Sequence, residues 1–178
     1  MSTSQNFKVA INLLVLMWIV QGINMVTQYW VSRWGIYPNS LEHLPGILIA
    51  PFTHGSLPHI ISNSMPFFVL AILVGQLKHF WSVTLFVIIA SGTLVWFFGR
   101  PATHVGASGL IMGYWGFLLI YGWLVKKWQP ILYSLLVFLF YGGMVITVVD
   151  FRSHISYESH IFGLISGLVI AWILAAKK

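Results

Sequence analysis

The chain has 178 residues, of which 58% are hydrophobic and only 7% are charged. A soluble domain carries about 25% charged residues, so this composition, with a mean hydropathy of +0.88, predicts an integral membrane protein. The sequence has no cysteine, which excludes disulfides, thiolate metal sites and cysteine nucleophiles. The formal net charge of +6 is too dispersed for nucleic-acid binding and suits membrane orientation and contact with anionic lipid.

Six apolar segments are long enough to cross a membrane, which takes about 20 residues of helix. Each is uniformly apolar rather than alternating, so the segments predict helices and not the strands of a barrel. They cover residues 9–29, 59–77, 81–98, 108–125, 130–149 and 160–176. We therefore expect an all-α integral membrane bundle of six helices, formed by residues 1–178 as a single domain with a helical core at about 9–176.

The first two spans are joined by a long connection, residues 30–58. It contains Trp30, Trp34 and Tyr37, followed by an apolar stretch at 46–52 that is punctuated by prolines. This composition predicts a structured loop in the membrane interface rather than a flexible linker.

Basic residues predict the orientation. With six spans both termini share one side, and that side carries six lysines against three arginines on the other. The excess predicts cytoplasmic termini. The three acidic residues and six of the seven histidines then lie at the extracytoplasmic end, which is where we expect the chemistry.

Ser108 and His160 are the first candidates for that chemistry. Ser108 lies in the sequence GASG at the start of the fourth span, and His160 opens the sixth. Polar groups at membrane depth are costly and often functional. Glycines follow each of them at helical spacing, including Gly163 and Gly167, so the two spans are expected to pack closely and to bring a Ser–His pair together. The alternatives are small residues that serve packing alone and a histidine that is solvated at the interface.

The second span adds His59 and Asn63, which share one helical face. Their N–H groups suit oxyanion stabilisation together with the backbone N–H of Ser108; an interhelical Asn–His clamp is the structural alternative. A metal site formed by His54, His59 and His104 is disfavoured because no carboxylate lies inside the spans, and we expect neither metal nor cofactor. Asp150 is a candidate third member of a triad, although a dyad is the simpler interpretation.

Taken together, three ordered motifs resemble the rhomboid family of intramembrane serine proteases, in particular the small bacterial members with six helices. The motifs are HGSLPHIISN at 54–63, GASG at 106–109 and HIFGLISG at 160–167. The long first loop is also similar. The resemblance covers nearly the whole chain.

The resemblance implies a specific assignment of roles. Ser108 would be the nucleophile and His160 the base, without an aspartate. His59, Asn63 and the Ser108 amide would form the oxyanion site, with His54 supporting the second helix. Gly106 would permit the turn before the nucleophile. Gly163 and Gly167 would be the glycines that trail the histidine.

Two features depart from the family pattern. Met112 stands where many bacterial members have an aromatic residue against the histidine, and residues 47–52 lack a Trp–Arg pair. The departures bear on loop structure and specificity more than on the dyad.

The expected function is therefore proteolysis of membrane-spanning protein substrates by a multi-pass protein of the bacterial cell membrane. The expected partners are these substrates and membrane lipid. A catalytically inactive rhomboid-like scaffold that binds membrane clients is the rival interpretation. A small transporter is disfavoured because the sequence shows no internal repeat.

Overall fold

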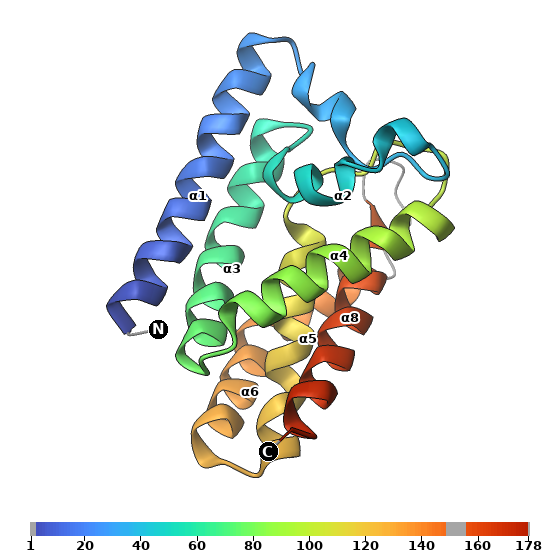
Figure 1. Cartoon of the computed structure of the whole chain (residues 1–178). Coiled ribbons are helices and arrows are strands. Elements are labelled where there is room, and N and C mark those ends of the chain that lie inside the picture. Colours follow the sequence, from blue (N-terminus) through green and yellow to red (C-terminus); the bar gives the residue numbers. More distant parts are fainter. Residues whose placement is uncertain (1–2, 149–155, 178) are drawn as a thin grey trace.

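The computed structural model describes residues 3–148 and 156–177 (Figure 1). Within these residues the long helices are α1 (Thr3–Val26), α3 (Leu57–Gln76), α4 (Phe80–Phe98), α5 (Ser108–Val125), α6 (Trp128–Tyr141) and α8 (Tyr157–Ala175). The shorter helices are η1 (Val31–Trp34), η2 (Leu41–His43), α2 (Gly46–Ile49), η3 (Ala50–Phe52), η4 (Gly142–Met144) and α7 (Val145–Val148).

The six predicted spans are confirmed: six helical segments of the described chain are long and apolar enough to cross a membrane. Their limits differ from the prediction mainly at the ends, since α1 already begins at Thr3. The fifth span is less regular than predicted, because α6 ends at Tyr141 and a 3-10 turn precedes α7. This turn falls on Gly142 and Gly143, and glycine is unfavourable inside a helix.

The connection between α1 and α3 contains four short helices, as expected for a structured loop. It contacts the segment 99–107 between α4 and α5 through one antiparallel bridge, Ile36 to His104. The N–H of His104 donates to the Ile36 carbonyl at 2.8 Å, and the N–H of Ile36 donates to the His104 carbonyl at 3.0 Å. Two loops far apart in the sequence are thereby held together at one end of the bundle.

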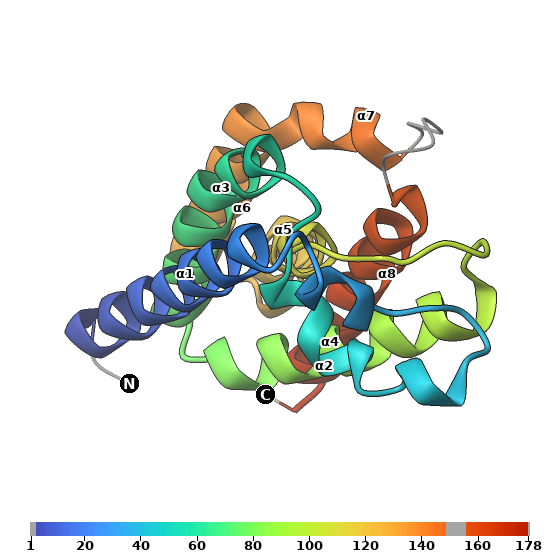
Figure 2. The ribbon, with the colours of Figure 1, turned by 90° about the horizontal axis from the view of Figure 1, so that it is seen from above.

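Helix α5 is the centre of the bundle, and Figure 2 shows it surrounded by the other helices. Twelve of its eighteen residues are buried, among them the large side chains Tyr114, Phe117 and Tyr121. By contrast, the outer helices direct large apolar side chains outwards, as Ile19 on α1 and Phe138 on α6 illustrate. An apolar surface of this kind fits a lipid environment.

Glycines bring α5 and α8 into backbone contact. A Cβ atom at Gly163 would collide with the carbonyl oxygen of Gly109, and one at Gly167 with that of Gly113. At Gly116 an added Cβ would lie 2.8 Å from the Leu164 carbonyl oxygen. The order of these contacts shows that the two helices run parallel, so their first turns lie at the same end of the bundle.

Candidate active site

A cavity of about 820 Å³ opens among the first turns of α3, α5 and α8, with walls from α7 and the segment 99–107. Five residues with predicted roles at the site line this cavity: His59, Asn63, Ser108, Met112 and His160. They come from three helices that are distant in the sequence. The structure therefore brings these five residues together, whereas their chemical roles and the Ser108–His160 hydrogen bond remain predictions.

Ser108 is the first residue of α5, because the preceding loop turns sharply at Gly106. Gly106 has a φ of +113°, and a Cβ atom there would lie 2.5 Å from Cε1 of His59. Only glycine fits such a backbone without strain. The N–H groups of a helix's first turn lack acceptors within the helix, so the Ser108 amide suits a donor role at the cavity.

His160 lies in the first turn of α8, where it is 8% exposed. Its Nδ1 is 2.9 Å from the carbonyl oxygen of Thr147. Because a carbonyl only accepts, Nδ1 carries the proton, and the neutral ring has its lone pair on Nε2. This tautomer is the one that a general base needs.

Asn63 and His59 occupy one face of α3 at the cavity. Asn63 is 8% exposed, and its side-chain nitrogen is buried without a hydrogen-bond partner among the described residues. Leaving a buried donor unsatisfied costs about 1–3 kcal/mol. Such a cost is tolerated where a ligand or a transition state supplies the acceptor. Among the residues of α3, the unpaired side-chain nitrogen of Asn63 is therefore the strongest indication of a functional role.

His54 does not line the cavity but lies behind it, fully buried. Its ring packs edge-on against His59, with centroids 5.0 Å apart, and Nε2 accepts the Ala107 N–H at 3.3 Å. The His54 carbonyl in turn accepts from the side chains of Asn24 and Ser32. Sequence reasoning missed these two residues, because a single polar side chain in α1 and another in η1 form no recognisable motif.

Burial, followed by the nearby His59, lowers the pKa of His54 to about 3. An unfolded histidine titrates near pH 6.5, so below that pH the unfolded chain binds a proton that the folded chain does not. Stability should therefore fall as the pH drops from about 6.5 towards 3, by up to roughly 1.4 kcal/mol per pH unit for this group. Thermal unfolding in detergent at pH 7, 6 and 5 measures the effect. His54→Gln should show a shallower dependence, and an equal slope in both proteins would contradict the assignment.

Met112 lies one turn after Ser108, is 1% exposed and contributes to the cavity wall. Gly163 and Gly167 lie away from the cavity, at the α5–α8 contact described above. Asp150, considered as the third member of a triad, lies outside the described residues.

Among the described residues no group of three histidine or acidic side chains is placed to hold a metal ion, and His104 faces Ser156 rather than the other histidines.

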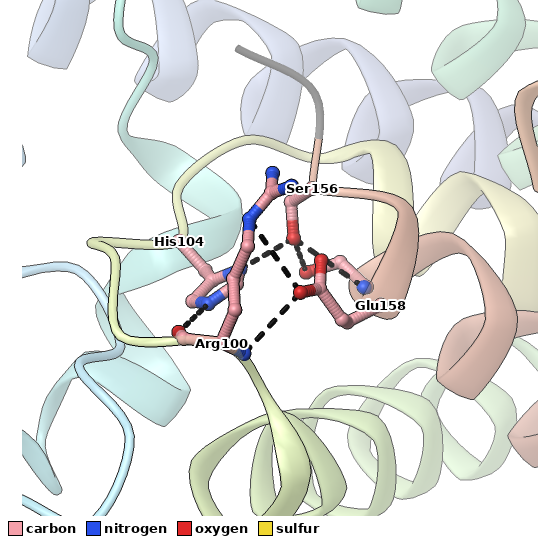
Figure 3. Close-up of polar contacts among 5 residues, drawn as sticks. Arg100, His104, Ser156 and Glu158 are labelled. Atoms are coloured by element: carbon pink, nitrogen blue, oxygen red, sulfur yellow. Dashed lines mark hydrogen bonds and ion pairs between the residues drawn. The ribbon is translucent and has the colours of Figure 1, made fainter. Parts of the chain in front are cut away.

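Sequence reasoning also missed a group of polar contacts beside the cavity, which Figure 3 shows. Nδ1 of His104 is 2.6 Å from the hydroxyl of Ser156, and Glu158 forms an ion pair with Arg100. The sequence predicts only that the acidic residues lie at the extracytoplasmic end, yet Glu158 is buried, with 5% of its surface exposed. Its contacts join Arg100, just after α4, to the start of α8, and no sequence spacing indicated that pairing.

Comparisons with known proteins agree with the motifs. The family model described as the Rhomboid domain matches residues 42–177. An uncharacterised protein of Mycobacterium leprae is 32% identical over 176 residues, covering 93% of this chain and 70% of that protein. An uncharacterised protein of Mycobacterium tuberculosis is 30% identical over 174 residues, covering 92% and 72%. A protein of Acanthamoeba polyphaga mimivirus with rhomboid in its name is 29% identical over 151 residues, covering 79% and 81%.

The fold and its cavity define a multi-pass membrane protein, and the chain belongs to the rhomboid family.

Proposed function

We propose that this rhomboid-family protein is an intramembrane serine endopeptidase that uses Ser108 and His160 as a dyad. The observation that carries the proposal is the shared cavity, in which a helix-starting serine, a histidine with Nδ1 bound to a carbonyl and the unpaired Asn63 amide converge. Family membership supports the same reaction class. The experiment is incubation of the purified chain in liposomes with a membrane-spanning substrate, with fragments identified by mass spectrometry; no cleavage of any helix-destabilised substrate would contradict it.

In the first step the Oγ of Ser108 attacks the peptide carbonyl carbon while Nε2 of His160 takes the hydroxyl proton. The carbonyl oxygen becomes an oxyanion, and the Ser108 amide, His59 and Asn63 are its proposed donors. His160 then gives the proton to the leaving amine as the C–N bond breaks. In the second step water attacks the acyl carbon and passes a proton to Nε2 of His160. His160 then returns this proton to the Oγ of Ser108 as the ester C–O bond breaks, which releases the new carboxyl terminus and restores the free enzyme.

The proposed substrate is a membrane-spanning segment that unwinds locally. A helical peptide bond has its carbonyl occupied by an internal hydrogen bond, so Ser108 reaches it only after that bond is broken. Glycine and proline lower helix stability by about 1 and 3 kcal/mol relative to alanine. Substrates with such residues near the cleaved bond should therefore be preferred.

Asn63→Ala should lower the turnover number by roughly 10²–10³-fold, the usual effect of losing one oxyanion donor in a serine hydrolase. The substrate KM should change little, because the donor acts on charge that develops in the transition state. Steady-state cleavage kinetics measure both quantities. Ser62→Ala is the matched control: Ser62 also lines the cavity, but its hydroxyl donates to the His59 carbonyl within α3. Equal losses in the two variants would argue against a specific role for Asn63.

We further propose that both termini are cytoplasmic and that the cavity opens on the extracytoplasmic side. Lys78 and Lys127 lie in turns at the end of the bundle opposite the cavity. Lysine is enriched on the cytoplasmic side of membrane proteins, so this placement supports the proposed orientation. In Figure 1 the start of α1 and the end of α8 lie in the lower half, towards that same end.

The cysteine-free sequence allows a direct test of this orientation. Leu41→Cys, at a position 75% exposed in the first loop, should react with a membrane-impermeant maleimide in intact spheroplasts. Lys127→Cys should react only after the membrane is permeabilised. The reverse pattern would invert the topology and move the proposed cleavage to the cytoplasmic side.

A further inference from the structure

His104 is a buried side chain, 3% exposed, four residues before Ser108 in the segment 99–107. Its backbone is fixed by the two-way bridge with Ile36. The segment continues through the Gly106 amide, which donates to the Ala50 carbonyl at 2.9 Å. The segment that carries His104 and leads into α5 is thus held by backbone hydrogen bonds. A residue that positions Ser108 requires such a fixed backbone.

The contacts of the ring define its protonation. Nε2 is 3.1 Å from the Arg100 carbonyl oxygen, which only accepts, so Nε2 carries the proton. In the neutral ring Nδ1 then accepts, and the Ser156 hydroxyl is its donor at 2.6 Å. Burial lowers the pKa of His104 despite the opposing effects of the Arg100 carbonyl and Glu158. The neutral, accepting form is therefore the form at neutral pH.

Ser156 is the residue that caps the N-terminus of α8. Its hydroxyl oxygen accepts from the Ser159 N–H at 3.4 Å and contacts the Ser159 hydroxyl at 2.7 Å. Its carbonyl accepts the His160 N–H at 3.3 Å. Ser156 caps the first turn of α8, and His160 lies in that turn. A displacement of Ser156 therefore also displaces the His160 ring.

Glu158 supplies a second tie between the same two segments (Figure 3). Its Oε1 accepts the Arg100 backbone N–H at 3.2 Å and lies 3.5 Å from Nε of that residue. The carboxylate is buried and in the first turn of α8, where negative charge is favourable. Glu158 therefore holds the start of α8 on the beginning of the segment 99–107, while His104 reaches the cap residue itself.

We propose that His104 is a positioning residue that sets Ser108 and His160 relative to one another through its hydrogen bond to Ser156. The contact joins a residue four positions before the serine to a residue four positions before the histidine. This inference rests on the proposed dyad and deepens it. His104 also lines the cavity, but the role proposed for it is to fix the start of α8 against the approach to α5 and not to take part in proton transfer.

The test is the reaction of the full chain, in liposomes, with a fluorophosphonate probe. The Ser108 oxygen forms a bond to phosphorus, fluoride leaves and His160 takes the proton. The amplitude of labelling measures the fraction of correctly folded sites, and the rate constant measures how well the dyad is aligned. These two readouts separate positioning from a purely structural role.

Three single variants and one double variant complete the design. His104→Phe keeps ring volume but removes both hydrogen bonds. Ser156→Gly removes the hydroxyl, yet glycine remains an acceptable N-cap that costs only a few tenths of a kcal/mol. Each should lower the rate constant roughly 10- to 100-fold at full amplitude, the scale of a small misplacement at a catalytic site, and the double variant should be no worse. His104→Asn places Oδ1 where Nδ1 was and should recover most of the rate.

Two results would overturn the inference alone: wild-type rate constants in His104→Phe and Ser156→Gly, or a reduced amplitude whose remaining fraction reacts at the wild-type rate. If His104→Phe does not fold, Ser156→Gly and His104→Asn decide the matter by the same readouts. If the wild-type chain neither reacts with the probe nor cleaves substrate, the proposed function itself is contradicted, and this inference fails with it.

Discussion

Replacing Ser108 or His160 with alanine is expected to abolish cleavage of a membrane-spanning substrate while leaving the bundle folded and inserted. Each change removes one half of a proton-transfer pair, and in a soluble serine protease a comparable loss lowers turnover by roughly 10⁶-fold. Because the two residues act as a unit, the double variant should be little worse than either single variant. Fragment release measured over long incubations, with the melting temperature in detergent, checks both parts.

Ser64→Ala is the appropriate control for the serine. The Ser64 hydroxyl donates to the Ile60 carbonyl within α3 at 2.7 Å and is not part of the cavity wall. It should keep wild-type turnover. If either member of the dyad could be replaced without a large loss, the assignment of Ser108 and His160 would have to be abandoned, whereas the fold would stand.

Gly163→Ala and Gly167→Ala should each lower both the melting temperature and the activity. In each case the added Cβ falls on a carbonyl group of α5, and overpacking of this kind costs about 1–3 kcal/mol. Alanine is the better helix former by about 1 kcal/mol, so helix propensity alone predicts the opposite sign. The collision pushes α8 away from α5 and carries His160 with it.

Gly22→Ala is the matched control for these glycines, since Gly22 also lies in a membrane helix but an added Cβ there meets nothing within 4 Å. It should leave the melting temperature unchanged or slightly raised and the activity unchanged. Thermal unfolding in detergent and cleavage rates for the three variants provide the comparison. Unchanged values for Gly163→Ala and Gly167→Ala would show that α5 and α8 can separate without loss.

The sequence predicted the six spans well because they depend on a strong local signal, and five of the residues it proposed for the site line one cavity. Long apolar runs admit few structures in a membrane, and Gly106, Ser108 and Gly109 form a compact motif. The break at Gly142 and Gly143 was missed because hydropathy is insensitive to helix regularity. The His104–Ser156 contact, which joins residues 52 positions apart, was missed because neither residue belongs to a recognisable motif. Neither residue type is restricted to such a role, so only the folded chain could pair them.

The backbone contact between α5 and α8 also determines when, during biosynthesis, the proposed site is complete. A chain emerges from the ribosome N-terminus first, so α5 is complete well before α8, with α6 and α7 made in between. Until α8 docks, the α5 backbone that Gly163 and Gly167 contact is uncovered, and the proposed base His160 is absent. On the proposed mechanism the nascent chain is therefore inert towards neighbouring membrane proteins, and proteolytic competence arises only when α8 is in place.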